Sequence, residues 1–203
     1  MTNSQRYNAL DKRISELSAR FLPKTFSQSG SYSAAELDNA RAFRVLVHAE
    51  LEHYFEDRAI DISDRAFELW KTKSKASSAI VHLLSNMVGE QHGLPSKLGT
   101  NKTAISIAGK VLAQYKHDIN NNNGIRIPNL LQILLPVGIS EAEIDAVWLS
   151  TTDGFAAKRG ATAHSAAINY TIDPKDDAQT VSQIMNGVRD LDILLNGIRK
   201  KLR

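Results

Sequence analysis

Apolar residues recur at spacings of three and four along most of the chain, which is the pattern of amphipathic helices. The predicted helices run from about Ser4 to Phe21, from Ala34 to about Arg58, through a further stretch after Asp61 that includes Trp70, over Ala79–Met87, from about Ala104 to Ile119, onward from Pro128, through Ile144 to Trp148, and from Pro174 to Leu202. The best candidate for a strand, Ile168–Ile172, is only a few residues long. We therefore predict an all-α protein built as an irregular helical bundle.

Loop and capping residues separate these helices. The segments expected to be loops are Ser27–Ser33, Gly89–Asn101 and Asn120–Gly124. Ser33 or Ser31 can cap the second helix, with Glu36 completing a capping box after Ser33. A second such box, Ser140 with Glu143, is expected to open the helix that carries Trp148. Gly154 is expected to mark a joint further along.

The length of 203 residues and the 42% hydrophobic content fit a single domain over residues 1–203. Its parts would be an N-terminal helix and loop at 1–33 and a core at 34–203. The chain has no cysteine, which excludes disulfides, thiolate metal sites and a cysteine nucleophile, and suggests a reducing compartment. No signal-peptide segment and no apolar run of about 20 residues is present, so we expect a cytoplasmic protein without a membrane partner. The net charge of +3 permits an anionic partner but does not require one.

The usual enzyme motifs are absent. No glycine-rich phosphate loop, nucleophile elbow or HExxH sequence occurs. Only two of the six histidines, His48 and His53, are close in sequence, and a spacing of five does not place them on one helix face. We therefore expect no cofactor and no metal, and we interpret both histidines as ordinary half-buried side chains or ion-pair partners.

One segment, Gly154–Ala167, carries candidate chemistry. Arg159 and His164 are separated there by four small or weakly polar residues, so both can approach a phosphate. Arginine stays charged and can bind two phosphate oxygens, whereas histidine titrates near neutral pH and can exchange the proton of an attacking hydroxyl. Together they are sufficient for metal-free cleavage of RNA.

The spacing of this pair has a geometric consequence. Five residues along a helix turn the second side chain roughly 140° from the first. The two side chains of one chain therefore converge only if the helix begins or kinks between them, which Gly160 could permit. Pairing two such segments across a two-fold axis would also solve the problem, so the motif predicts a homodimer.

This Arg-x4-His stretch on a late helix resembles the R-x(4-6)-H motif of HEPN domains. The earlier stretch Arg41–Asp57, RAFRVLVHAELEHYFED, is similar to the N-terminal helix of the RiboL-PSP type of HEPN domain. The resemblance covers roughly Ala34 to Arg203. It implies a four- to five-helix core with extra helices that dimerises, cuts RNA without metal and places the catalytic arginine and histidine of both copies in one cleft.

The resemblance assigns Arg159 and His164 as the catalytic pair and implies a toxin or phage-defence effector, with a possible antitoxin or regulatory protein as partner. An acidic residue could orient His164 or pair with Arg159. The possible supporting residues are Glu50, Glu52, Arg44, Thr162 and Ser165. Gly160 stands where many family members have a polar residue.

Two other functions stay open at this stage. The Gly160 departure and the modest charge suggest a non-catalytic HEPN-like module that binds RNA, a nucleotide or a protein partner. A purely structural helical dimer that scaffolds another protein is the third reading. It would place Arg159 and His164 away from any cleft.

Overall fold

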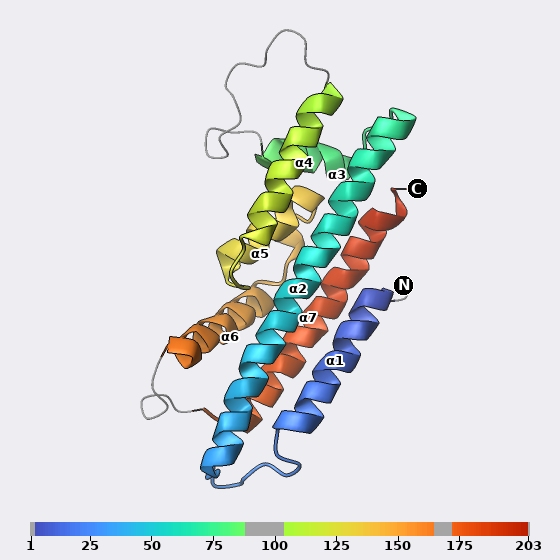
Figure 1. Ribbon diagram of the computed structural model, residues 1–203. Coiled ribbons are helices and arrows are strands. Elements are labelled where there is room, and N and C mark those ends of the chain that lie inside the picture. The colour runs from blue at the N-terminus through green and yellow to red at the C-terminus, as the bar shows by residue number, and fades with distance from the viewer. Residues whose placement is uncertain (1–2, 88–103, 165–171, 203) are drawn as a thin grey trace. The chain divides into compact units, whose positions relative to one another are not determined.

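The apolar repeats of the chain form helices in the computed structural model, which describes residues 3–87, 104–164 and 172–202, without the side chains of 161–164. Within these residues the structure has seven α-helices, two short 3-10 helices and no strand, which confirms the all-α prediction (Figure 1). The elements are α1 (Gln5–Phe21), α2 (Ala34–Lys73), α3 (Ser78–Met87), α4 (Ala104–Asn120), α5 (Ile127–Leu134), η2 (Leu135–Val137), η3 (Glu141–Glu143), α6 (Ala146–His164) and α7 (Pro174–Lys200).

The chain falls into two compact units. The first contains Met1–Tyr54, Gly124–Ile127 and Asp145–Asp192, and the second contains Phe55–Asn123, Pro128–Ile144 and Ile193–Arg203. The long helices α2 and α7 each contribute residues to both units. The prediction of one domain over the whole chain stays a prediction.

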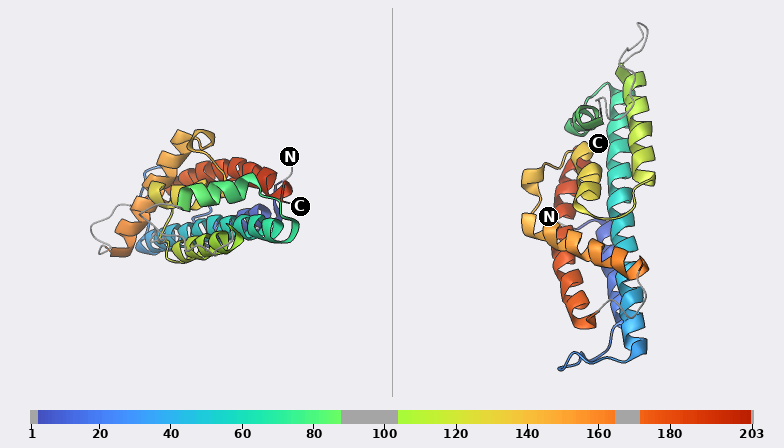
Figure 2. Two further views of the ribbon diagram at one scale, coloured as in Figure 1. Left: turned by 90° about the horizontal axis from the view of Figure 1, so that it is seen from above. Right: turned by 90° about the vertical axis from the view of Figure 1, so that its left-hand side faces the viewer.

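In the first unit, α1 lies beside α2 and α7, and α6 crosses them (Figure 1, Figure 2). Its core is built from the apolar faces of these four helices. Buried members include Leu10, Ile14, Leu17, Phe43, Val47, Leu51, Phe155, Ile184 and Val188. Burying a side chain of this size stabilises the fold by about 1.5–3 kcal/mol.

A buried aspartate fixes the start of α1 in the same unit. The Asp192 carboxylate accepts hydrogen bonds from the Ser4 amide and hydroxyl at 2.7 Å each, and from the Tyr54 hydroxyl at 2.8 Å. The Ser4 hydroxyl oxygen in turn accepts from the Tyr7 amide at 3.0 Å and caps α1. One carboxylate on α7 therefore holds both α1 and α2.

The second unit packs α3, α4 and α5 with the C-terminal part of α2 and the end of α7. The fully buried Tyr115 hydroxyl donates to the Ile133 carbonyl and joins α4 to α5. At the end of η2, Gly138 adopts a φ of +99°, a left-handed conformation that favours glycine. This unit contains none of the predicted site residues.

Helix α2 differs from its prediction, because one helix of 40 residues replaces two shorter ones. No glycine or proline occurs between Ala34 and Lys73, so the sequence contains no residue that would stop the helix. Its beginning matches the prediction, since the Glu36 carboxylate accepts the Ser33 amide at 2.8 Å and the Ser33 hydroxyl accepts the Glu36 amide at 3.3 Å. The apolar positions beyond Arg58 are buried as well, so tertiary packing extends the helix.

Two other predicted features differ from what the structure shows. Ser140 and Glu143 do form a capping box, but it closes on the 3-10 turn η3 and not on an α-helix. Gly154 lies inside α6, so the joint predicted there is wrong. The loops at Ser27–Ser33 and Asn120–Gly124 are found as predicted, apart from helix ends. The Gly89–Asn101 loop and most of the Ile168–Ile172 strand candidate lie outside the described residues.

Candidate functional site

Helix α6 positions the candidate arginine, and Asp145 begins this helix. Its carboxylate accepts the Trp148 amide at 2.7 Å, which is a typical N-cap interaction. The Trp148 indole then donates to the Ile184 carbonyl of α7 at 2.9 Å. A Cβ added at Gly187 would lie 2.1 Å from the indole ring, so α7 needs glycine there for this close approach. Trp148 thereby fixes α6 against α7 near its first turn.

Arg159 lies three turns further along α6. Its side chain is half-buried, and its Nε is fully buried without a hydrogen-bond partner in the part of the chain that the structure describes. Most buried N–H groups in folded proteins have a partner, and one that lacks it costs about 1–3 kcal/mol. The Arg159 guanidinium therefore has one buried donor that none of the described residues uses.

The path of α6 restricts how Arg159 and His164 can act together. The helix continues without interruption through Gly160 to His164, so it does not begin between the two residues. On a continuous helix their side chains leave the axis roughly 140° apart. The side chains of His164 and Thr162, and the whole of Ser165, lie outside the described residues.

His48, on α2 in the same unit, is a neighbour of Arg159. Its side chain is only 3% exposed. Burial, and secondly the positive charge of Arg159, lower the pKa of His48 to about 4. At neutral pH this imidazole is uncharged. Its Nδ1 is buried and, among the described residues, accepts or donates no hydrogen bond.

Two further groups adjoin His48. The Glu52 carboxylate, one turn further along α2, lies 3.8 Å from Nδ1, which is too far for a hydrogen bond. On another side, a Cβ added at Gly124 would lie 3.5 Å from His48 Nε2. Gly124 has a φ of +134°, so glycine lets the backbone turn there and pass close to the imidazole.

Arg44, one turn before His48, forms a buried ion pair with Asp177 of α7. Nη2 and Nε of the guanidinium donate to the two carboxylate oxygens at 2.8 and 3.1 Å, and both side chains are 2% exposed. Burial raises the pKa of Asp177 above its ordinary value, while the hydrogen bonds and charge of Arg44, and the charge of Lys158, offset part of that rise. Arg44 is therefore part of the core of this unit and supports α2 against α7.

The remaining predicted acid, Glu50, has a different partner. Its carboxylate binds Arg13 Nε of α1 at 2.9 Å in a largely exposed ion pair. Of the two acids proposed as supporting residues, Glu52 is the one that the structure brings near the Arg159 neighbourhood. On α2, Arg44 and Glu52 therefore lie one turn before and one turn after His48, and the charge of Arg159 acts on the His48 imidazole.

His48 is the residue that the sequence reasoning missed. The available signal was its register, because Arg44, His48 and Glu52 follow one another at intervals of four and so share one side of α2. His53, the other histidine of this helix, is exposed. We name His48 and Arg159, with Glu52 beside them, the His48–Arg159 site.

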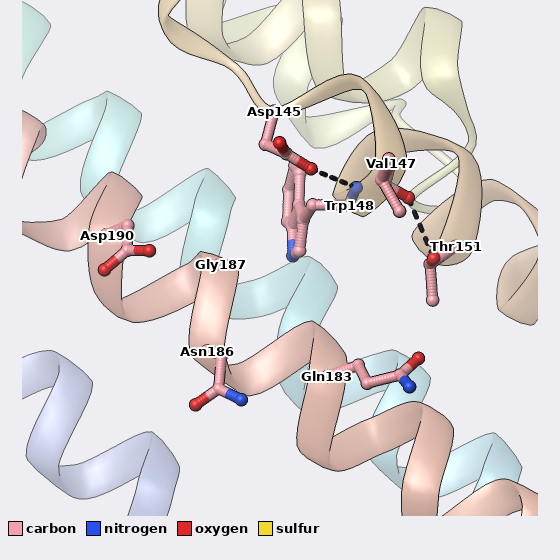
Figure 3. Close-up of a pocket in the computed structure, with 8 residues that line it drawn as sticks. All are labelled: Asp145, Val147, Trp148, Thr151, Gln183, Asn186, Gly187 and Asp190. Carbon is pink, nitrogen blue, oxygen red and sulfur yellow. Dashed lines mark hydrogen bonds between the residues drawn. The ribbon is translucent and has the colours of Figure 1, made fainter.

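A pocket of about 340 Å³ lies elsewhere in the first unit (Figure 3). Its lining comes from the start of α6 and the middle of α7: Asp145, Val147, Trp148, Thr151, Gln183, Asn186, Gly187 and Asp190. The Asp145 carboxylate and the Thr151 hydroxyl are already engaged with the Trp148 amide and the Val147 carbonyl. No residue of the His48–Arg159 site lines this pocket, so it is separate from the candidate chemistry.

The described residues contain neither a metal-binding cluster nor a helix suited to span a membrane. Among the side chains of 3–87, 104–160 and 172–202, no three of histidine, aspartate or glutamate gather in a way that could hold a metal ion. The helices in these same ranges lack the length and apolarity needed to cross a bilayer. Comparison of the chain with protein-family models, with curated proteins and with solved structures finds no match.

Proposed function

We propose that this protein is a metal-independent endoribonuclease of the HEPN type, in which Arg159 binds the phosphate that is cut. The observation that supports this proposal most is the buried Nε of Arg159, which has no hydrogen-bond partner among the described residues. A half-buried guanidinium with an unused donor is suited to bind an oxyanion. The Arg-x4-His sequence and its position on a late helix add to this support.

The proposed reaction needs no group beyond the protein and the RNA. The 2′-oxygen of a ribose attacks the adjacent phosphorus, a new P–O2′ bond forms and the P–O5′ bond breaks. A base removes the proton of the 2′-hydroxyl, and an acid protonates the departing 5′-oxygen. Arg159 stabilises the charge on the phosphoryl oxygens, and His164 is the proposed acid–base group. The products are a 2′,3′-cyclic phosphate and a 5′-hydroxyl.

We propose a homodimer as the active form. Side chains five residues apart on a continuous helix diverge, so one chain alone does not easily bring Arg159 and His164 to the same phosphate. A two-fold axis beside α6 would let the arginine of one copy face the histidine of the other. In a cell such an enzyme would act in the cytoplasm as a toxin or phage-defence effector, controlled by an antitoxin or regulatory protein.

The experiment is incubation of purified protein with single-stranded RNA in EDTA. Wild type should cut, and Arg159→Gln should cut about 100- to 1000-fold more slowly, since one stabilising donor and its charge are lost. His164→Ala should lose a comparable factor while folding and dimerisation survive. Arg126→Gln is the matched control, because Arg126 is a half-exposed arginine of the same unit that pairs with Asp153. It should cut like wild type.

The alternative function is a module that binds RNA, a nucleotide or a protein partner without cutting. No described atom lies within 4 Å of a Cβ added at Gly160, so packing does not require glycine there. The absence of the polar residue that many HEPN domains have at this position therefore favours the binding module. This module would retain RNA in a filter-binding assay, with affinity that falls steeply as salt rises, and would yield no cleavage product. Retained cleavage by His164→Ala would remove the proposed mechanism.

A further inference from the structure

The pocket between the start of α6 and the middle of α7, here named the Trp148 pocket, has room for one small chemical group (Figure 3). All of its lining residues belong to the first unit. Its volume of about 340 Å³ is at the lower end of the range found for ligand pockets, about 300–1,000 Å³. A single long side chain of another protein is a ligand of suitable size.

The charged part of the lining is acidic. Asp145 at the start of α6 and Asp190 on α7 both line the pocket, and no lysine, arginine or histidine does. Asp145 Oδ1 accepts the Trp148 amide at 2.7 Å. The Asp190 carboxylate lies 3.8 Å from Nε of Arg189, too far for a hydrogen bond, and its side chain is 72% exposed. The pocket therefore presents two negative charges to a ligand and no positive charge.

The uncharged polar part of the lining adds further acceptors. The carboxamides of Gln183 and Asn186 line the pocket from α7, and both residues are exposed. The Thr151 hydroxyl donates its proton to the Val147 carbonyl at 2.8 Å, so its oxygen is left as an acceptor. The carboxylates and these oxygens come from both helices (Figure 3). A ligand with several N–H donors matches this arrangement.

The apolar part of the lining is made by two neighbouring side chains. The Trp148 indole N–H is already bonded to the Ile184 carbonyl at 2.9 Å, so the ring offers the pocket only apolar surface. Val147 is 74% exposed. A single exposed valine is ordinary, but this one adjoins a pocket and can cover the methylene groups of a ligand. The lining as a whole suits an apolar stem that ends in a cation.

We propose that the Trp148 pocket binds an arginine side chain of a partner protein. A guanidinium carries a permanent charge and five N–H donors, so it can bond to acceptors on both helices at once, and arginine is enriched at protein interfaces. Free arginine fits less well, because no lining cation would bind its α-carboxylate. A nucleotide would bring phosphates toward two carboxylates. No residue of the His48–Arg159 site lines the pocket, so the inference does not depend on the proposed nuclease.

The probe is N-acetylarginine amide, which has the side chain and peptide groups of an arginine within a protein. It is titrated into the full-length protein while NMR follows the indole N–H signals of the two tryptophans. The Trp148 signal should shift with a Kd of about 1–10 mM, the range expected when one side chain is bound alone. Trp70 lies in the second unit and should not respond. N-acetylcitrulline amide, the uncharged analogue, should bind about tenfold more weakly.

Three variants test the carboxylates. Asp190→Asn changes an exposed side chain and should lower the affinity by about threefold to tenfold. Asp145→Asn should have a similar effect with α6 intact, because asparagine caps a helix as well as aspartate does. Asp176→Asn is the matched control, since it removes an exposed carboxylate of α7 that does not line the pocket. It should bind the probe like wild type.

Four results would overturn the inference. The first is a Trp148 signal that does not respond to N-acetylarginine amide, and the second is an equal response to the citrulline analogue. The third is a loss of affinity in Asp176→Asn as large as in Asp190→Asn, which would show a general charge effect. The fourth is tighter binding of putrescine or of a nucleoside than of N-acetylarginine amide, which would make the pocket a site for a free diamine or a nucleobase.

Discussion

Two arginines of the first unit, Arg44 of α2 and Arg159 of α6, have opposite surroundings. Arg44 is 2% exposed and makes two hydrogen bonds to the Asp177 carboxylate. The charge of Arg159 acts on His48, which lies one turn after Arg44 on α2. The buried Nε of Arg159 bonds to none of the described residues. The first arginine is balanced by a carboxylate, whereas the second acts on an imidazole that burial, and secondly the charge of Arg159, keeps neutral. The difference separates a cation that supports the fold from the one that we propose binds the phosphate of the RNA.

Burial alone does not distinguish these two roles. A buried ion pair contributes to a fold only when its hydrogen bonds are satisfied, and removing one partner leaves the other charge desolvated. A buried donor without a partner lowers stability, and such groups are retained where they serve a site. The comparison therefore predicts a large loss of stability when the Arg44–Asp177 pair is broken and a small change when Arg159 is replaced.

The largest effect is expected from Asp177→Asn. This change removes the charge that balances Arg44 in a fully buried position, so the free energy of unfolding should fall by about 3–5 kcal/mol. Urea denaturation followed by circular dichroism measures it. Glu50→Gln is the control, because Glu50 forms a largely exposed pair with Arg13 from the same helix and should cost less than about 1 kcal/mol.

A double variant makes this prediction sharper. Replacing the pair by apolar residues, with Arg44→Met and Asp177→Leu together, should recover most of the lost stability, because no desolvated charge remains. If Asp177→Asn unfolds as easily as Glu50→Gln, the pair is not the structural element described above.

The next effect is the pH dependence contributed by His48. The folded state holds its pKa at about 4, whereas the unfolded chain has the ordinary value of 6.5. Above pH 6.5 both states are uncharged and His48 adds no pH dependence. As the pH falls from 6.5 to 4 the unfolded state binds the proton first, so the free energy of unfolding decreases by about 3 kcal/mol. Below pH 4 this contribution becomes constant.

Comparison with His48→Gln isolates this contribution from that of the carboxylates. The difference in unfolding free energy between wild type and variant should change between pH 7 and pH 4.5 and stay constant above pH 7. If the unfolding free energies of wild type and His48→Gln changed in parallel with pH, the imidazole of His48 would not be neutral and buried in the folded protein. NMR titration of His48 in wild type supplies the same answer where the variant is too unstable to measure.

The smallest effect on stability is expected from Arg159→Met. This arginine is half-buried and one of its donors is unused, so the free energy of unfolding should change by no more than about 1 kcal/mol. The pKa of His48 should rise, because a positive charge that lowers it is gone, but should stay below 6.5 because burial is the larger cause. A loss of stability like that of Asp177→Asn would place Arg159 in the core and end the comparison.

Much of the fold was predictable from local patterns. The Ser33–Glu36 box, the proline at 174 and the apolar repeats locate helix starts and buried faces within a few residues. Errors arose where local signals had two readings. The Ser140–Glu143 box fits a 3-10 turn as well as an α-helix, and Asp145 is the residue that caps α6. A glycine inside a helix, such as Gly154, resembles a joint when only the sequence is known.

The site was predictable only in part. Arg159 was found because small residues surround it in the sequence. The role of His48 depends on α6 lying against α2, and the role of Arg44 depends on Asp177, which is 133 residues away. Contacts over such separations follow from packing and not from spacing along the chain. The register of Arg44, His48 and Glu52 on α2 was visible, but it did not indicate which residue would meet each of them.

The proposed nuclease is tested most directly by the rate at which wild type and Arg159→Gln cut one end-labelled RNA in EDTA, with the 3′ end of the product identified. We expect cleavage by wild type, a 2′,3′-cyclic phosphate on the product and a rate about 100- to 1000-fold lower in the variant. Equal rates for the two proteins, or intact RNA with folded wild-type dimer, would contradict it.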